Sequence, residues 1–293
     1  MASAIGNRTW DVAVIGAGVW GLATARAART RGFSVIAVDA ERVGAGASGG
    51  IVGALSPHVP ERWNGKKAFQ FRALQMAPDY WRAVEAATGL PTGFAASGRL
   101  MPLPDAATRA LAEERAAGAS EHWGEVARWQ VLDTAPGWLA PEVAPFGAVH
   151  ETLSARLFPR AACAALAGAA RAEGVEVREG LPAHRIAPGE VTTSEGPLRA
   201  RHIVIAAGFA GFRLLGIAKG KGVKGQAALL RAEAPEGAPL IYADGVYAVP
   251  QPGGLVAVGS TSENRFSHDG TDSLLDPVIE TARALSPLLA RAE

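Results

Sequence analysis

The stretch DVAVIGAGVWGLATARAARTRGFSVIAVD, residues 11–39, decides the fold of this chain. It opens on a short apolar run, which is typical of a buried parallel strand. Gly16, Gly18 and Gly21 follow, and after them comes a stretch of Ala and Arg, which are good helix formers. A second apolar run then ends at Asp39. This order of strand, Gly-rich turn, helix, strand and acid predicts a βαβ unit that binds a dinucleotide.

Each glycine of this motif has a physical task. Gly16 permits the tight turn, Gly18 lets the backbone approach a pyrophosphate, and Gly21 lets helix and strand pack closely. The anion then lies at the helix N-terminus, and Asp39 can accept hydrogen bonds from ribose hydroxyls. The alternative interpretation is an ordinary Gly-rich turn. The motif alone does not separate NAD from FAD.

Two further segments favour FAD. Residues 44–50, Gly-Ala-Gly-Ala-Ser-Gly-Gly, follow the second strand and allow a flat or charged group to approach the backbone closely. Residues 203–208, Ile-Val-Ile-Ala-Ala-Gly, form another apolar strand that ends in small residues. A nicotinamide enzyme leaves both segments unexplained.

Length and composition limit the class of protein. The 293 residues are 48% apolar and 19% charged, enough to bury a large core, and the net charge of +1 favours neither nucleic acid nor an anionic membrane. A single cysteine excludes a disulfide framework, and the six histidines show no metal-ligand spacing, so we expect no metal site. The chain shows no apolar stretch long enough to span a membrane and no signal peptide, which predicts a soluble, cytoplasmic protein.

The pattern of apolar residues and of breakers predicts the other elements. Residues 120–149, rich in Trp and Pro, remain unassigned. The last strands, from 223 to 258, alternate with turns as in an antiparallel sheet. We expect helices over 22–31, 66–88 (kinked or divided at Pro78), 105–117 (capped by Asp105), 159–173 and 276–292, and strands over 34–38, 98–102, 203–205, 226–230, 240–242, 246–249 and 255–258.

This combination resembles the family of FAD-dependent amine and amino-acid oxidases, which includes glycine oxidase, D-amino-acid oxidase and sarcosine oxidase. The resemblance covers nearly the whole chain, and the order and spacing of its motifs carry it more than any single motif does. Beyond residues 11–39 and 46–50, the matching segments are 156–160 with the following helix, 199–208, 223–226, and 247–250 through 258–261.

The resemblance implies an α/β fold in which a Rossmann-like FAD-binding domain carries an inserted, largely antiparallel β (α+β) substrate domain. The FAD-binding domain is expected to be discontinuous, from residues 1–90 and 151–218. The substrate domain is expected from residues 91–150 and 219–275, with a C-terminal helix over 276–293.

The resemblance also implies the site. Tyr247 is the position whose phenol faces the substrate side of the flavin, although a sheet tyrosine with a wet hydroxyl is the alternative. His58 is a candidate acid, base or substrate contact, although a loop histidine that only forms hydrogen bonds is favoured. The expected FAD-binding residues are Gly16, Ala17, Gly18, Val19, Gly21, Asp39, Ala40, Arg42, Gly46, Ala47, Ser48, Gly49, Gly50, Ala207 and Gly208.

Several residues have a plain structural alternative. Ser48 either donates to a phosphate or ribityl oxygen or serves as a cap or turn residue, and Arg42 either lies over the adenosine or is a solvated surface arginine. Lys219, Lys221 and Lys224 are interpreted as a solvated loop, and Cys163 as a small helix residue that faces a core. Gln251 departs from the family, which often has Arg after this proline.

The expected function is oxidation of the C–N bond of a small amine or amino acid. Hydride passes to flavin N5, the imine hydrolyses, and dioxygen or another acceptor reoxidises the flavin. The family continues beyond the last helix with a Gly-x-Arg-Pro strand and a final Gly-rich turn, which this chain does not match. We therefore expect a fragment that lacks the C-terminal segment of the family, and a naturally short version is the alternative. A flavin dehydrogenase with a non-oxygen acceptor and an FAD-binding protein with little activity are the alternatives. Substrate and oligomeric state are not predicted.

Overall fold

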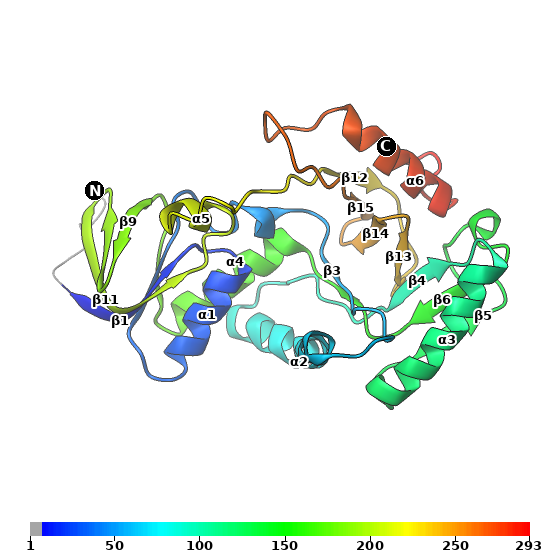
Figure 1. Cartoon of the computed structure of the whole chain (residues 1–293), viewed down its shortest axis with the longest axis horizontal. Coiled ribbons are helices and arrows are strands. Elements are labelled where there is room, and N and C mark those ends of the chain that lie inside the picture. The colour runs from blue at the N-terminus through cyan, green and yellow to red at the C-terminus, as the bar shows by residue number, and fades with distance from the viewer. Residues whose placement is uncertain (1–7) are drawn as a thin grey trace. The chain divides into compact units, whose positions relative to one another are not determined.

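The computed structural model describes residues 8–293, which form two compact units (Figure 1). The first unit takes in the described residues up to Gly50 together with Ala83–Thr92 and Pro159–Val223, and the second takes in Ile51–Arg82, Gly93–Phe158 and Lys224–Glu293.

These boundaries differ from the expected ones in four segments. Residues 51–82 and 151–158 belong to the second unit, although the resemblance assigned them to the FAD-binding domain. Residues 91–92 and 219–223 belong to the first unit, although the resemblance assigned them to the substrate domain. For the start of the first segment the reason is packing, because Ile51, Val52 and Ala54 contact the core of the second unit's sheet.

The first unit is built on a six-stranded sheet in the order β8-β2-β1-β11-β10-β9. Strands β8, β2, β1 and β11 run parallel, and β10 and β9 continue the sheet as antiparallel strands. Its strands are β1 (Thr9–Ile15), β2 (Val35–Val38), β8 (Glu176–Arg178), β9 (Ala183–Ala187), β10 (Glu190–Thr193) and β11 (Gly196–Ile205).

Side-chain alternation along β1 separates the two faces of this sheet. Val12 and Val14 pack with Ala25 of helix α1 (Val19–Arg29) and Ala170 of helix α4 (Pro159–Ala172). The side chains between them, such as Ala13, pack instead with residues of β10 and β11. Helices α1 and α4 lie side by side (Figure 1), and a short helix, α5 (Ala210–Leu214), follows β11.

The second unit is built on a seven-stranded sheet in the order β12-β15-β14-β13-β4-β6-β5. All its neighbours pair antiparallel except β13 and β4, so the expected antiparallel character is confirmed. Its strands are β4 (Arg99–Pro102), β5 (Trp129–Leu132), β6 (Ala148–Glu151), β12 (Ala227–Arg231), β13 (Leu240–Ala243), β14 (Val246–Gln251) and β15 (Leu255–Gly259), and a separate pair joins β3 (Ala54–Leu55) to β7 (Ala155–Arg156).

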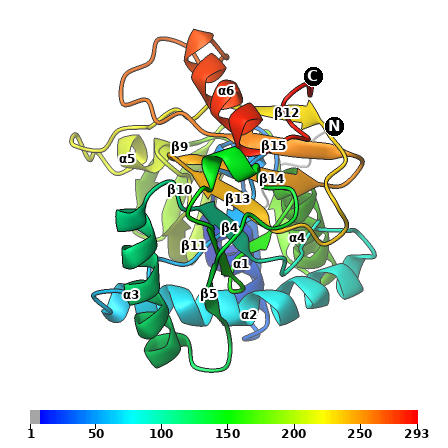
Figure 2. The same cartoon turned by 90° about the vertical axis from the view of Figure 1, so that its right-hand side faces the viewer.

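Helices cover parts of this sheet (Figure 2). Helix α6 (Asp276–Leu285) packs on β14 and β15 through Val278, Ala282 and Leu285. Helix α3 (Ala106–Trp123) packs on β5, and the Asp105 carboxylate caps it by accepting from the Thr108 amide at 2.7 Å, as predicted.

Helix α2 (Gly65–Thr88) is continuous through Pro78, so of the two predicted effects of this proline the structure excludes the division. Two expectations about helix ends need correction. Helix α3 runs to Trp123, beyond the predicted end at 117. Helix α6 ends at Leu285 rather than at 292, because Ser286 precedes a proline and takes an extended backbone. Among the described residues, no helix combines the length and the apolar content that spanning a bilayer requires.

Candidate functional site

The Gly-rich turn of the first unit joins β1 to α1. Gly16 adopts a φ of 109°, and a Cβ on it would collide with the carbonyl of Ala206. A Cβ on Gly21 would collide with the carbonyl of Gly16, which is the close approach of helix and strand that the motif requires. These two glycines therefore fix the fold of the turn.

Gly18 has a different environment from its two neighbours in the motif. A Cβ on Gly18 would meet only the Ser48 side chain, with Oγ at 3.0 Å. Gly18 is the residue before the first turn of α1, whose amides lack intrahelical partners. The backbone here is thus open to an anion at a helix N-terminus.

Ser48 lies at the same helix end. Its Oγ accepts a hydrogen bond from the amide of Val19 at 3.1 Å, which is the cap role named as an alternative. A hydroxyl that accepts in this way still carries its own proton. Ser48 can therefore cap α1 and donate to a phosphate oxygen at the same time.

Asp39 follows β2 and is half-buried. One of its carboxylate oxygens accepts from the Ala17 amide at 2.7 Å, and the other accepts from the Glu41 amide at 3.0 Å. A carboxylate offers about four acceptor positions, so about two remain for a ribose diol. The neighbouring residues Ala40 and Arg42 are exposed.

The second Gly-rich segment lies against the first turn. The amide of Gly44 donates to the carbonyl of Ala17 at 3.0 Å, and residues Ala47–Gly49 form a short 3₁₀ helix. From α4, Arg160 Nε donates to the Gly49 carbonyl at 2.9 Å. Cys163 is buried beneath the segment as expected, and burial raises the pKa of its thiol.

The end of β11 lies beside the end of β1. Ile15 and Ile205 are partners in the parallel pair of β1 and β11, and the Ala206 amide donates to the Ile15 carbonyl at 2.8 Å. Ala207 and Gly208 come next. The structure thus brings the motif glycines, Asp39, Ser48 and the end of β11 to the carboxyl edge of the parallel strands, where ligands bind in open α/β sheets.

The second unit contains the two predicted catalytic residues. Tyr247 on β14 pairs directly with Tyr242 on β13, with ring centroids 4.5 Å apart. The Tyr247 hydroxyl accepts a hydrogen bond from Arg99 Nη1 at 3.2 Å. Arg99, on β4, was not predicted from the sequence as a site residue.

Arg99 is buried with a carboxylate. Its guanidinium Nε lies 3.0 Å from Oε1 of Glu151, and both side chains are at most 5% exposed. The Nε–H bond is not aimed at that oxygen, so charge rather than an aligned hydrogen bond pairs the two groups. Glu151 in turn accepts from the amides of Leu153 and Ser154, each at 2.9 Å, and from the Ser154 hydroxyl.

His58 takes no part in the hydrogen bonds of Tyr247, Arg99 and Glu151. Its amide donates to Oε1 of Gln70 at 2.7 Å, and within residues 8–293 its imidazole forms no hydrogen bond. Ser56, two residues before His58, accepts a hydrogen bond through its hydroxyl from the Ser154 hydroxyl at 3.2 Å, and Ser154 also contacts Glu151.

Two further polar residues of the second unit, Gln251 and Lys224, are buried. Gln251 is buried, and its amide donates to the Leu157 carbonyl at 3.1 Å, so it ties the end of β14 to the residue that follows β7. Lys219 and Lys221 are exposed as predicted, but Lys224 is not solvated, and the prediction is wrong for this residue. It is buried, with Nζ 3.2 Å from Asp272 and 3.6 Å from Glu263, because the chain after β15 folds back over it.

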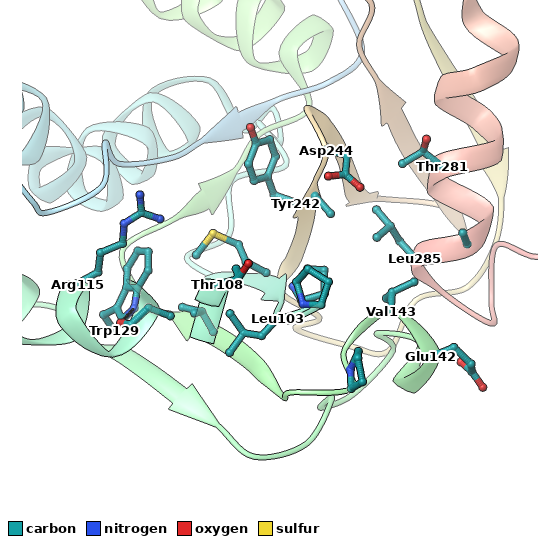
Figure 3. A pocket seen from close by; sticks show the side chains of 18 residues that line it. Leu103, Thr108, Arg115, Trp129, Glu142, Val143, Tyr242, Asp244, Thr281 and Leu285 are labelled. Carbon is teal, nitrogen blue, oxygen red and sulfur yellow. Dashed lines mark hydrogen bonds between the residues drawn. The ribbon is translucent and has the colours of Figure 1, made fainter. Parts of the chain in front are cut away.

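The second unit also holds a cleft of about 620 Å³ (Figure 3). Tyr242 and Asp244 lie on one side of it, and Trp129 and Arg115 lie on the other. Arg115 is held there by Glu61, at 2.7 and 3.0 Å. The other residues that line the cleft are mostly apolar and include Leu103, Val143 and Leu285.

Comparison with known proteins identifies the family of this chain. The family model described as FAD dependent oxidoreductase (DAO) matches residues 11–293. The bifunctional protein ThiO/ThiG of Nostoc sp. is 28% identical over 304 residues, which cover 96% of this chain and 44% of that protein. Glycine oxidase of Geobacillus kaustophilus is 29% identical over 318 residues, covering 97% of this chain and 78% of that protein. The chain therefore spans less than half the length of the first relative.

Solved structures show the same fold. The crystal structure of glycine oxidase from Geobacillus kaustophilus matches with a TM-score of 0.82 at 23% identity, over 98% of this chain and 80% of that one. L-proline dehydrogenase from P. horikoshii matches with a TM-score of 0.79 at 16% identity, over 97% and 79%. The expected fold class is confirmed, and the chain belongs to the family of FAD dependent oxidoreductases.

Proposed function

We propose that this chain holds FAD on the carboxyl edge of its parallel strands and oxidises the C–N bond of a small amine or amino acid. The observation that carries the cofactor assignment is the open N-terminus of α1. There Gly18 leaves room for a pyrophosphate, and the Ser48 hydroxyl retains a proton to donate. Asp39 has acceptor positions left for a ribose. These residues fit FAD, the cofactor of the family.

The chain's own residues bind and orient, and the cofactor supplies the redox chemistry. When bound, FAD accepts a hydride equivalent from the carbon next to the amine nitrogen. In this proposal Gly16 and Gly21 shape the turn, Gly18 and the amides of α1 receive the pyrophosphate, and Tyr247 contacts the substrate through its hydroxyl. His58 has no bonded partner for its ring among the described residues that would hold it as a base, and we assign it no catalytic step.

The test has two stages. The purified chain is titrated with FAD and, separately, with NAD, and flavin absorbance and fluorescence report binding. We expect saturable binding of FAD in preference to NAD. Selective binding of NAD contradicts the cofactor assignment.

In the second stage, turnover is measured with the FAD-loaded protein. Glycine, sarcosine and D-alanine are tested for peroxide formation under air, and in parallel for reduction of an artificial electron acceptor without oxygen. Amine-dependent bleaching of the flavin supports the reaction class, and the acceptor that restores it separates an oxidase from a dehydrogenase. Stable FAD binding without bleaching by any of the amines contradicts the proposed reaction for these substrates.

A further inference from the structure

A buried guanidinium supports the predicted substrate-facing tyrosine. Arg99 is 4% exposed, and its Nη1 donates to the Tyr247 hydroxyl at 3.2 Å. The same guanidinium lies 5.5 Å from the ring centroid of Tyr242, the cross-strand neighbour of Tyr247. Both aromatic rings thus lie close to one fixed positive charge.

The direction of this hydrogen bond decides what Tyr247 can do. A guanidinium has only donors, so the phenol oxygen must be the acceptor. The phenol's own proton is then left over and points away from Arg99. An oxygen that accepts from a cation also makes its O–H a stronger donor, because hydrogen bonds in a chain polarise one another. Tyr247, half-buried on β14, therefore presents a donor to a ligand rather than an acceptor.

Arg99 itself is anchored and is not free to bind a ligand. The fully buried Glu151 neutralises its charge at 3.0 Å, and Glu151 is fixed by the amides of Leu153 and Ser154 at the turn after β6. A buried charge that lost this partner would be strongly unfavourable. The pair therefore holds a single geometry around the Tyr247 oxygen.

We infer that Arg99, clamped by Glu151, is a positioning residue that fixes the Tyr247 phenol as a hydrogen-bond donor to an acceptor group on the substrate. The acceptor that a small amino acid carries is its carboxylate. The inference rests on the proposed function for the identity of the ligand, but the state of the phenol does not depend on it.

The first test needs no ligand. The intensity ratio of the tyrosine Fermi doublet in the Raman spectrum reports whether a phenol accepts or donates, and the chain has only three tyrosines. The difference between the native protein and Tyr247→Phe isolates Tyr247, and we expect the signature of an acceptor bonded to a cation. The same difference in an Arg99→Met background should lose that signature. An unchanged Tyr247 signature without Arg99 overturns the inference.

Arg99→Met leaves Glu151 buried without a partner and can fail to fold. The double variant Arg99→Met/Glu151→Gln removes both charges, and the Gln amide oxygen still accepts from the Leu153 and Ser154 amides. It serves as the folded background in which the Raman comparison is repeated.

The second test uses the FAD-loaded protein, with acetate as a non-reacting carboxylate probe and glycine as the substrate. We expect Arg99→Met/Glu151→Gln and Tyr247→Phe each to raise the acetate Kd and the glycine KM about tenfold. Combining them should raise these constants no further, because Arg99 acts through Tyr247. Arg99→Lys, which keeps a cationic donor, should recover part of the loss, and Arg82→Met, which breaks the exposed ion pair with Asp79, should change neither constant.

Additive losses show that Arg99 acts independently of Tyr247 and overturn the inference. Failure of the native chain to bind FAD rejects the proposed function alone, since the Raman comparison still decides the role of Arg99.

Discussion

The two units offer their polar groups in opposite ways. At the carboxyl edge of the first unit the groups are mainly backbone amides and carbonyls, left accessible by glycines such as Gly18 and supported by Asp39 and Ser48. In the second unit they are side chains of opposite charge, Arg99 and Glu151, buried in an antiparallel sheet. A backbone site depends on the absence of side chains, whereas a charged site depends on the presence of two matched ones.

The largest effect should come from breaking the buried pair. Glu151→Leu leaves the Arg99 charge buried and the amides of Leu153 and Ser154 without their acceptor, so it should lower the free energy of unfolding by about 3–5 kcal/mol. Urea denaturation measures this. The matched control is Glu61→Leu, which breaks the pair with Arg115 where both side chains are more than a quarter exposed, and should cost less than about 1 kcal/mol. Equal losses would show that burial does not distinguish the two pairs.

The next effect concerns the turn of the first unit. Gly16→Ala should cost about 2–4 kcal/mol of unfolding free energy, because the residue has a positive φ and its Cβ would meet the Ala206 carbonyl. Gly46→Ala is the control, since a Cβ there meets nothing within 4 Å, and it should change the unfolding free energy by no more than about 0.5 kcal/mol. If the two variants unfold alike, the close approach at Gly16 is not what fixes the turn.

Gly18→Val should separate binding from folding. Only the Ser48 side chain lies within 4 Å of an added Cβ, so the apoprotein should keep its fold, but the valine side chain would occupy the space of the pyrophosphate. We expect FAD affinity to fall about a hundredfold or more, which is about 2.7 kcal/mol. Flavin loading and far-UV circular dichroism are measured together, and full loading of this variant would reject the placement of the pyrophosphate.

Asp39→Ala should weaken FAD binding by about 1–3 kcal/mol, because the ribose loses a charged acceptor. The variant also loses the hydrogen bond that the Asp39 carboxylate accepts from the Ala17 amide inside the Gly-rich turn. Calorimetric titration of FAD into the native and variant chains gives the difference. Asp39→Asn, which keeps one acceptor oxygen, should lose less than Asp39→Ala, and unchanged affinity in both variants would place Asp39 away from the ribose.

The smallest effect is a pH dependence in the second unit. Hydrogen bonds from Gln226 and from the amide of Leu274, with the charge of Lys224, lower the pKa of Asp272 from 3.8 to about 2. A lowered folded-state pKa means that its stabilisation is fully present above about pH 4 and is lost as the pH falls towards 2. The stability difference between the native chain and Asp272→Asn should therefore be constant above pH 4 and shrink below it. A difference that grows on acidification would contradict the sign.

The difference between the units also explains what the sequence could predict. The βαβ unit of residues 11–39 is local, so strand, turn, helix and acid could be identified from spacing alone. The small residues at the end of β11 allowed that strand to be predicted as part of the same site. Arg99 lies 148 positions from Tyr247 and 52 from Glu151, and no local pattern connects the three. The available signal was a lone charge within the apolar strand residues 98–102.

Two errors have different origins. Lys224 was interpreted as solvated from its glycine neighbours, because the acids that cover it, Glu263 and Asp272, come much later in the chain. The end of α6, by contrast, is determined by adjacent residues, Ser286 and the proline after it. It was overlooked because Ala and Leu residues continue beyond it and favour a helix.

The packing of Cys163 beneath the second Gly-rich segment has a consequence for kinetics. The thiol is 3% exposed, its Sγ lies 3.4 Å from the Ser48 carbonyl, and the chain has no other cysteine. A thiol-directed label therefore needs a local opening of the structure, and the raised thiol pKa slows the reaction further. Because the thiol contacts residues 44–50, which are expected to touch the cofactor, we expect a ligand bound on this loop to lower the rate of labelling.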